Sequence, residues 1–528
     1  MPIWTMLALL GVCAPLYTLL LNPIIAYLID RKSLRKYTSY NLFCALTNAG
    51  WCLEAWRGGI RSKSLSALHK THPVIRIGPD SLSYGHPDAY RDIYGHGSKC
   101  VKDTFYQTEA AEGAHFNLGN VIDKAEHTRK RKMLAGAFSA RNVQDHWEGG
   151  VVRGAVRMFL SAVEAHCTAP LVDGTDPNPH DLNFDFRLWS NLFTIDAIGE
   201  IAMSDQLGLL ERGKDTVTAE TVDGKVYTVP FRDCLHASKI AHARLAYADK
   251  WYHFNSRYAT RLFPSYRHLW KLSAGWSDFV NHQAKKRLAR HLAGEKLNDI
   301  FEHIMHDREG TPYNLEWGEI SAECAVILDA GSATTAIALN NVIYWLARNP
   351  ICLARLREEV DHALDAGGEE DAVAPYDKVK NLPYLRACLD ESLRITPPFS
   401  YNLPRRTPPD GATILGEYVP GDTTVSMSAY VAHRDASCFV EPDNFIPERW
   451  LGEKRKEIQG YFVAFSAGSR GCIGRNISYL EQTVLVANFV RQYEFSLPCE
   501  GWEQERVEVT NLLPGALPLK VWRREIRQ

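Results

Sequence analysis

One cysteine-containing loop near the C-terminus constrains the fold more than any other feature of this chain. The loop combines Phe465, Gly468, Arg470, Cys472 and Gly474, and a helical pattern follows it directly. Glycines permit tight turns and a close approach to the backbone, because they carry no side chain. A cysteine at the start of a helix lies where the helix dipole favours a thiolate. The loop therefore predicts a thiolate presented to a flat, bulky cofactor.

The other cysteines provide the background for this interpretation. The chain has 12 cysteines spread along its 528 residues, without any Cys-x-x-Cys pair. This spacing disfavours a structural zinc site and a disulfide framework. An isolated cysteine is by default a small, buried apolar residue. The glycines and the arginine around Cys472 argue against that default.

The complete spacing of the loop resembles the haem-binding loop of the cytochrome P450 family. The resemblance implies that Cys472 is the axial ligand of a haem b iron. It also implies that Phe465, Gly468, Arg470 and Gly474 contact the haem, with Arg470 near a cofactor carboxylate. The implied fold is mainly α with small β-sheets, and the match runs from about residue 70 to the C-terminus.

Three charged residues extend the resemblance. Glu391 and Arg394 are three positions apart, so they share one face of a helix that ends before Pro397. On a surface such a pair contributes only about 0.2–0.5 kcal/mol. Together with Arg449, however, they resemble the family's Glu-x-x-Arg motif and its second arginine segment. The resemblance implies a buried ion network, in which the loss of one partner is severe.

A basic helical segment before residue 140 has two interpretations. Runs of this kind usually form a solvated face. The family places a helix here against the haem propionates, so the resemblance assigns His127 and Arg131 to them, with Arg405 as a further candidate. The remaining cations of the segment would then meet an acidic electron-donor protein; they are Lys124, Arg129, Lys130 and Lys132.

A long apolar segment over residues 314–348 predicts a single helix. It contains Ala330, Gly331 and Thr334, which resemble the family's oxygen-activation motif and are the candidate catalytic residues. A glycine inside a helix costs about 1 kcal/mol relative to alanine, so Gly331 suggests a functional opening. Ala333 occupies the motif's acidic position, which leaves neighbouring hydroxyls, water or the substrate as sources of protons.

The N-terminus predicts a membrane anchor. Residues 1–29 carry no charged side chain, and a basic cluster follows at 31–36. Such a segment can cross a hydrocarbon core of about 30 Å, and the basic flank predicts a cytosolic catalytic domain. The alternatives are a cleaved signal peptide and an interfacial hairpin bent at Pro15 or Pro23.

Hydrophobic periodicity gives the remaining organisation. Helices are expected within 120–165, 185–212, 232–305, 314–348, 381–396 and 476–490, and strands at 74–77, 81–84, 405–424 and 518–522. We expect three segments along the chain: a transmembrane anchor over 1–30, an irregular membrane-proximal linker over 31–70, and a haem-binding catalytic domain over 71–528.

The resemblance implies a monooxygenase that inserts one oxygen atom from O2 into an organic substrate. No flavin or nicotinamide domain is recognised, so electrons are expected from NADPH through a separate cytochrome P450 reductase, with cytochrome b5 as a second candidate donor. A formal charge of −2 argues against a nucleic-acid partner. The expected location is the endoplasmic reticulum membrane, with a single span and a cytosolic catalytic domain.

Other segments suggest a branch of the family. Residues 94–97, 102–106 and 475–482 resemble fungal enzymes related to benzoate para-hydroxylases and cresol-type hydroxylases. A small aromatic or phenolic substrate is therefore expected, such as a cresol, hydroxybenzyl alcohol or benzoate, in fungal secondary metabolism or aromatic catabolism. The alternatives are a haem-thiolate isomerase, dehydratase or peroxygenase that needs no reductase, and a non-catalytic haem-binding protein.

Overall fold

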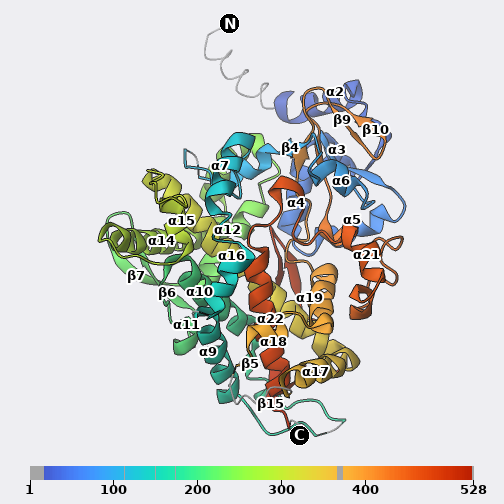
Figure 1. The fold of residues 1–528 in the computed structure, drawn as a ribbon. Coiled ribbons are helices and arrows are strands. Elements are labelled where there is room, and N and C mark those ends of the chain that lie inside the picture. The colour runs from blue at the N-terminus through green and yellow to red at the C-terminus, as the bar shows by residue number, and fades with distance from the viewer. Residues whose placement is uncertain (1–16, 112, 149, 173, 366–372, 526–528) are drawn as a thin grey trace.

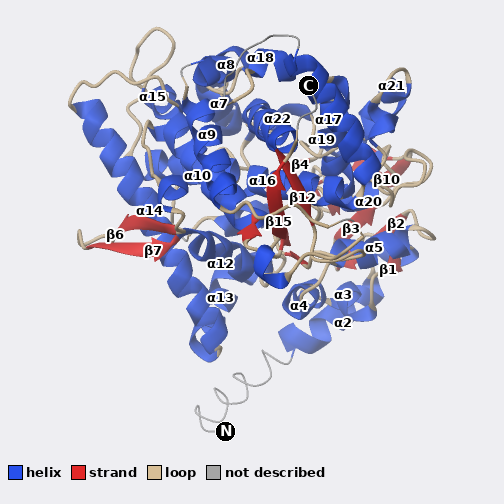
Figure 2. Ribbon diagram, turned by 90° about the horizontal axis from the view of Figure 1, so that it is seen from below, coloured by secondary structure: helices blue, strands red, loops and turns tan. Residues whose placement is uncertain are grey.

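The computed structural model describes residues 17–111, 113–148, 150–172, 174–365 and 373–525 (Figure 1). Helices dominate the molecule, and small sheets lie among them (Figure 2). The mainly α fold with small sheets is therefore confirmed. The helices are α2 (Asn22–Ile29), α3 (Leu42–Leu46), α4 (Ala49–Arg57), α5 (Arg61–His69), α6 (Ala89–Tyr94), α7 (Lys124–Leu134), α8 (Ala140–Glu148), α9 (Val151–Ala165), α10 (Phe186–Met203), α11 (Leu209–Arg212), α12 (Phe231–Ala243), α13 (Tyr252–Leu262), α14 (Pro264–Leu292), α15 (Ile300–Met305), α16 (Trp317–Arg348), α17 (Pro350–Asp365), α18 (Tyr376–Val379), α19 (Pro383–Ile395), α20 (Ala429–Ala432), α21 (Lys454–Ile458) and α22 (Arg475–Gln492).

The largest sheet joins strands that are far apart in the sequence. Its order is β1 (Thr38–Ser39), β2 (Val74–Gly78), β3 (Ser81–Tyr84), β11 (Thr424–Ser426), β8 (Arg405–Arg406) and β4 (Val101–Lys102). The expected hairpin of β2 and β3 is present and pairs Ile75 with Ser83. The smaller sheets contain β5 (Phe184–Asp185), β6 (Thr216–Glu220), β7 (Val226–Pro230), β9 (Ala412–Ile414), β10 (Glu417–Val419), β12 (Tyr493–Ser496), β13 (Arg506–Glu508), β14 (Leu512–Pro514) and β15 (Pro518–Arg523).

Helix α16 passes through the centre of the molecule and packs against α10, α14, α19 and α22 (Figure 1). Within the described residues it is the one helix long and apolar enough to span a membrane, and more than half of its most apolar window is buried in the protein. Burial on several sides explains why its apolar residues do not form a single stripe. The predicted anchor lies largely outside the described residues, because the description begins at residue 17.

Two segments differ from the local structure expected from the sequence. Residues 31–70 are not irregular, because α3, α4 and α5 form there and β1 pairs with β2. Apolar side chains hold this segment to the domain, because Cys44, Trp51 and Leu65 are buried in one cluster with residues of β2. The stretch between residues 212 and 232, which lies outside the expected helices and strands, forms the β6–β7 hairpin. That hairpin packs on α14, a contact that local sequence does not reveal.

The position of Gly331 in α16 has a packing reason. A Cβ atom at Gly331 would lie 2.6 Å from Cγ1 of Ile198 on α10. This distance is far below van der Waals contact, so the missing side chain lets α10 and α16 approach closely. Close helix packing thus explains a glycine at this position, and its role as a functional opening stays a prediction.

We predict opposite effects for two helical Gly→Ala substitutions. Gly331→Ala should destabilise the protein by about 1–3 kcal/mol, because it overpacks the α10–α16 contact. Gly154→Ala in α9 has no atom within 4 Å of the new Cβ and should stabilise by about 0.5–1 kcal/mol. Denaturant unfolding of both variants tests this, and a neutral Gly331→Ala would contradict the packing argument.

Candidate active site around Cys472

Backbone hydrogen bonds fix the loop that carries Cys472. The Cys472 N–H donates to the Phe465 carbonyl at 2.8 Å, and the Gly471 N–H donates to the Gly468 carbonyl at 3.2 Å. Gly468 has a φ of +66°, and a Cβ atom there would clash with the Tyr94 carbonyl. Only glycine fits this position without strain. The loop then enters α22, whose N-cap is Gly474.

The other two glycines of the loop are not explained by protein contacts. A Cβ atom at Gly471 would have no neighbour closer than 3.4 Å, and one at Gly474 would meet only Phe138 at 4.0 Å. Neither position is crowded by protein atoms or has a positive φ. A bulky group approaching the loop accounts for both missing side chains, and this fits the expected haem.

Cys472 faces an interior space. The residue is accessible, yet burial raises the pKa of its thiol, against the opposing effects of the Gly474 N–H and Arg131. A side chain that faces an interior space rather than bulk solvent is both accessible and desolvated. The N–H groups of the helix terminus do lower the pKa of the free thiol, as expected, but desolvation is the larger effect and the net pKa is raised. A metal ion would supply the charge that stabilises the thiolate.

Two arginines join the cysteine loop to the region of α7. Arg131 donates to the Gly471 carbonyl. Arg470 donates to the carbonyls of Val121 at 2.6 Å and Ile122 at 2.8 Å, just before α7 begins. Arg470 thus positions the loop through the backbone, besides lying beside the expected cofactor carboxylates.

Four cations surround His127; they are Lys102, Arg131, Arg405 and Arg470. Among the described residues, no carboxylate lies within 4.0 Å of the charged nitrogens of these four side chains. Burial and then these neighbouring cations lower the pKa of His127 to about 4. Burial and then Arg405 lower the pKa of Arg470 to about 10. Buried like charges are costly unless an anion compensates them. The cluster therefore fits a dianionic ligand, such as the two propionates of haem b.

Arg405 reaches this cluster from β8. It is buried, and its guanidinium donates to the Tyr106 hydroxyl at 3.1 Å. Its charge also lies over the ring of Tyr94, at 5.0 Å from the centroid. The sequence places Tyr106 in the branch segment 102–106, and the structure adds that its hydroxyl orients the guanidinium.

The candidate catalytic segment of α16 lies next to the helix that follows Cys472. The Thr335 hydroxyl donates to the Ser478 hydroxyl of α22 at 3.0 Å. The Thr334 hydroxyl is exposed and donates to the Ala330 carbonyl at 2.8 Å. Ala330 is itself exposed, although it lies in the middle of a core helix, whereas Ala333 is buried. Ala330 and Thr334 therefore share an accessible face of α16.

Three charged residues at the same site belong to none of the sequence motifs. Lys239 of α12 forms an ion pair with Asp329 of α16, with its Nζ 2.6 Å from Oδ1. Glu109 interacts electrostatically with both and with Lys102. Asp329 directly precedes Ala330, so it could have been noticed as an acid one turn before Ala333. Lys239 and Glu109 gave no local signal, because the tertiary structure brings them there.

These contacts connect the residues of the site to one another in a closed series. The path runs from Cys472 through Arg131 and the cation cluster to Glu109. From there it continues through the Lys239–Asp329 pair to α16, and returns to the cysteine loop through the Thr335–Ser478 hydrogen bond. The thiol, the α16 segment and the three additional charged residues thus belong to one connected set, in which Cys472, Ala330 and Glu109 are accessible.

Glu391 is the centre of a buried ion network. Its carboxylate accepts hydrogen bonds from Arg394 at 2.8 Å, Arg449 at 3.1 Å and the indole N–H of Trp450 at 2.8 Å. The Ile446 N–H adds a fourth donor group at 2.9 Å. Glu391 and Arg394 are fully buried. The network thereby joins α19 to the segment that leads to the cysteine loop.

The expected electron-donor surface on α7 is smaller than the sequence indicated. Lys130 is buried and pairs with Glu319 and Glu323 of α16, with its Nζ 2.9 Å from the Glu323 carboxylate. Arg129 is engaged by Glu126 and Glu319. The interpretation of Lys130 as a surface cation is wrong, because the helix buries that face against α16.

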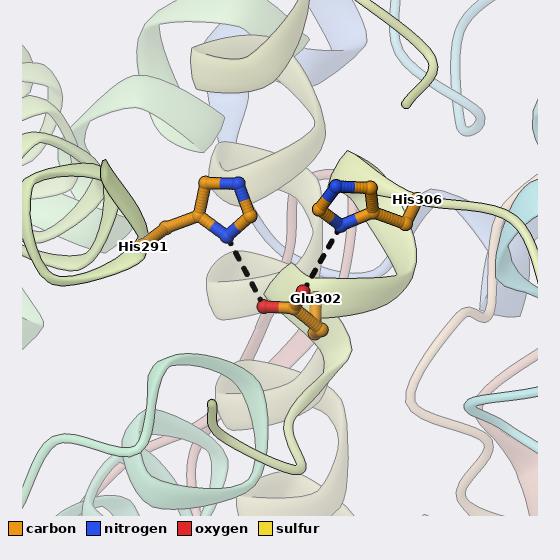
Figure 3. A group of neighbouring side chains, drawn as sticks. All are labelled: His291, Glu302 and His306. Carbon is orange, nitrogen blue, oxygen red and sulfur yellow. Dashed lines mark hydrogen bonds and ion pairs between the residues drawn. The ribbon is translucent and has the colours of Figure 1, made fainter. Parts of the chain in front are cut away.

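A second cluster of polar side chains, His291, Glu302 and His306, lies between α14 and α15 (Figure 3). Each imidazole directs its Nδ1 at one oxygen of Glu302, at 3.2 Å and 3.0 Å. A carboxylate only accepts, so both nitrogens carry protons and are not free to ligate a metal. Arg287 donates to the same carboxylate at 3.1 Å. The cluster is therefore a hydrogen-bonded clamp between the two helices.

Comparisons with known proteins agree with this geometry. The family model described as Cytochrome P450 matches residues 48–518. The chain is 28% identical over 489 residues to cytochrome P450 monooxygenase efuB of Hormonema carpetanum, covering 88% of this chain and 86% of the relative. It is 30% identical over 449 residues to cytochrome P450 monooxygenase atr2 of Stereocaulon alpinum, covering 83% and 81%. It is 28% identical over 433 residues to averantin hydroxylase of Dothistroma septosporum, covering 81% and 75%.

The Glu391 network predicts a large loss of stability on substitution. Glu391→Gln should cost about 3–5 kcal/mol, because it leaves two buried guanidinium groups without their carboxylate. Urea unfolding and haem retention on purification measure the effect. The control is Glu453→Gln, which breaks an exposed pair with Lys456 and should cost less than about 1 kcal/mol. Equal stability of the two variants would contradict a structural role of Glu391.

The assignment of Cys472 as iron ligand predicts a spectral change. Cys472→Ser should abolish the long-wavelength Soret band of the ferrous–CO complex, because a hydroxyl does not replace the thiolate. Cys499→Ser, at an exposed cysteine, should keep the band. A band retained in Cys472→Ser would remove this residue as the ligand.

Proposed function

The chain belongs to the cytochrome P450 family, and we propose that it is a membrane-attached monooxygenase that oxidises a small aromatic or phenolic compound in fungal secondary metabolism. The interior space enclosed by Cys472, the cation cluster and Thr334 carries the proposal. Relatives named as monooxygenases support oxygen insertion rather than isomerisation or plain haem binding. The narrower relationship to benzoate or cresol hydroxylases remains a prediction.

Each group of residues in the site has its own role around the haem b that the family binds. When bound, haem b supplies O2 activation, with electrons that reach it from a separate reductase. Cys472 would hold the iron, and the cations Arg131, Arg405 and Arg470 would neutralise the propionates. The Thr334 hydroxyl is placed to hold and pass a proton on the accessible face of α16. The buried core around α16 keeps bulk water from this face.

An aromatic cluster supports a small aromatic substrate. Phe105, Tyr106 and Tyr401 are buried together, with Phe399 packed against them. The Phe105 and Tyr106 rings lie edge to face at 5.3 Å. Phe105 and Tyr106 belong to the segment that ends at Glu109, and Phe399 is a partly accessible member of the cluster. Aromatic side chains favour edge-to-face or offset contact with another ring.

Exposed apolar side chains support attachment to a membrane. In α2 the described residues Ile24, Ile25, Leu28 and Ile29 are exposed. Further exposed side chains lie on α3, α4 and α13, which share one side of the molecule in Figure 2; they are Leu42, Phe43, Leu53, Phe254, Tyr258 and Leu262. Trp56 of α4 contacts Phe263 beyond α13 at 5.7 Å between ring centroids. Such a continuous apolar side fits a bilayer surface.

The proposed donor surface contains the exposed residues of α7. Lys124 and Lys132 are exposed there, on the helix that contacts the cysteine loop through Arg131. An acidic surface of NADPH–cytochrome P450 reductase, or of cytochrome b5, would complement these charges. We propose that this complex assembles at the endoplasmic reticulum membrane, with the catalytic domain in the cytosol.

The proposed reaction predicts a product one oxygen atom heavier than its substrate. Microsomes containing the protein and its reductase would be incubated with NADPH and a panel of cresols, hydroxybenzyl alcohol and benzoate. Mass spectrometry should find the oxidised product only when NADPH and reductase are both present. Product formation with peroxide alone, or without reductase, would favour a peroxygenase or isomerase instead.

The position of Thr334 predicts loss of coupling on substitution. Thr334→Ala removes the accessible hydroxyl and should increase hydrogen peroxide released per NADPH consumed by several-fold, with less product. Ser161→Ala in α9 is the control, because its exposed hydroxyl makes the same bond four residues back, to the Arg157 carbonyl at 3.0 Å. Unchanged coupling in Thr334→Ala would mean that protons arrive by another route.

A further inference from the structure

The ion pair of Lys239 and Asp329 lies at the site but belongs neither to the cation cluster nor to the Glu391 network. Lys239 Nζ is 2.6 Å from one oxygen of Asp329 and 2.9 Å from the other. The Asp329 side chain is 31% exposed, although the residue lies inside the core helix α16. Its neighbour Ala330 is exposed as well. The pair therefore lies directly beside Ala330, which shares an accessible face of α16 with Thr334.

Glu109 joins this pair from a third segment. The Thr108 hydroxyl is hydrogen-bonded to Nε2 of His242 at 2.7 Å, which fixes the end of the 3-10 helix Thr104–Glu109 to α12. Glu109 is accessible, yet burial raises the pKa of its carboxyl group. Its side chain therefore faces the interior, like Cys472, and its raised pKa favours a carboxyl group that can also donate a hydrogen bond.

Among the described residues, the cation beside Asp329 is already paired and is not available to an anionic substrate. Asp329 neutralises Lys239. Lys102, which interacts with Glu109, donates to the Gly119 carbonyl and lies 4.0 Å from the centroid of the Tyr106 ring, within the cation cluster. A substrate carboxylate beside this pair would meet the carboxylate of Asp329. Like charges in a desolvated site disfavour such a ligand strongly.

We propose that Glu109, Lys239 and Asp329 bind the hydroxyl group of an uncharged, hydroxylated substrate and exclude carboxylates. A hydroxyl group both donates and accepts a hydrogen bond, and it can bond to Asp329 and to Lys239 at once. The substrate hydroxyl is then held five residues before Thr334, about 7.5 Å along the helix axis, with the rest of the molecule against the aromatic cluster. This inference rests on the proposed function and narrows its substrate class from aromatic compounds to neutral phenols and alcohols.

The energetic reason for such selectivity is the cost of leaving buried polar groups unpaired. A site built to hydrogen-bond a hydroxyl group rejects an analogue without it more strongly than an apolar pocket rejects a missing methylene. Toluene would displace water from the ion pair without replacing its hydrogen bonds. Benzoate would bring a charge that the site does not compensate.

The test is equilibrium binding of three probes of similar size to the haem-loaded full-length protein by calorimetry at pH 7.5: m-cresol, toluene and benzoate. The wild type should bind m-cresol at least about 10-fold more tightly than either other probe, equivalent to about 1.4 kcal/mol. Asp329→Asn should strengthen benzoate binding by about 10-fold and weaken m-cresol, because Lys239 loses its counter-charge. Lys239→Met should weaken benzoate further.

Opposite shifts in these two variants separate recognition from general damage to the site. Glu457→Gln, at an exposed acid on α21, is the matched control and should change neither affinity. Each variant is first shown to retain the ferrous–CO band. Benzoate binding as tight as m-cresol in the wild type, no binding of m-cresol, or an unchanged preference in Asp329→Asn would overturn the inference. NADPH-dependent oxidation of any other compound would still report on the proposed function independently.

Discussion

The Glu391 carboxylate is the interaction on which the rest of this structure depends. It is fully buried, and it accepts hydrogen bonds from two guanidinium groups, one indole and one backbone N–H. Arg394 in turn donates to the carbonyls of His433, Pro442 and Asn444. A charge in a low-dielectric interior is tolerated only with such complete pairing. The network therefore fixes one path for the irregular chain that precedes the cysteine loop.

The cation cluster around His127 is balanced in a different way. Its four cations have backbone carbonyls, a tyrosine hydroxyl and aromatic rings as neighbours, rather than carboxylates. The missing negative charge has to come from a ligand, so binding of an anionic cofactor should also stabilise the folded chain. The charges around Glu391 are therefore balanced within the protein itself. The charges of the cation cluster, in contrast, are balanced only when the anionic cofactor binds.

The glycines and acidic residues of the site show which roles a short sequence motif can predict and which roles it cannot. Gly468 is required by its positive φ and by the nearby Tyr94 carbonyl, whereas Gly331 is explained by contact with Ile198. A sequence motif treats these residues alike, because it contains no information about the partner that each one faces. The missing acid at Ala333 was visible in the sequence, but the acid that borders the same space, Asp329, became meaningful only through Lys239.

The sequence alone determined the cysteine loop, the Glu-x-x-Arg pair, the long core helix and the mainly α fold. These features depend on short spacings or on periodicity within one element, and the chain itself carries that information. The tertiary structure decided the rest: the buried role of Lys130, the folded segment before residue 70, the β6–β7 hairpin, and the meeting of Glu109, Lys239 and Asp329. Such contacts join residues far apart in the chain, and their energies depend on burial and charge, which only the packed molecule defines.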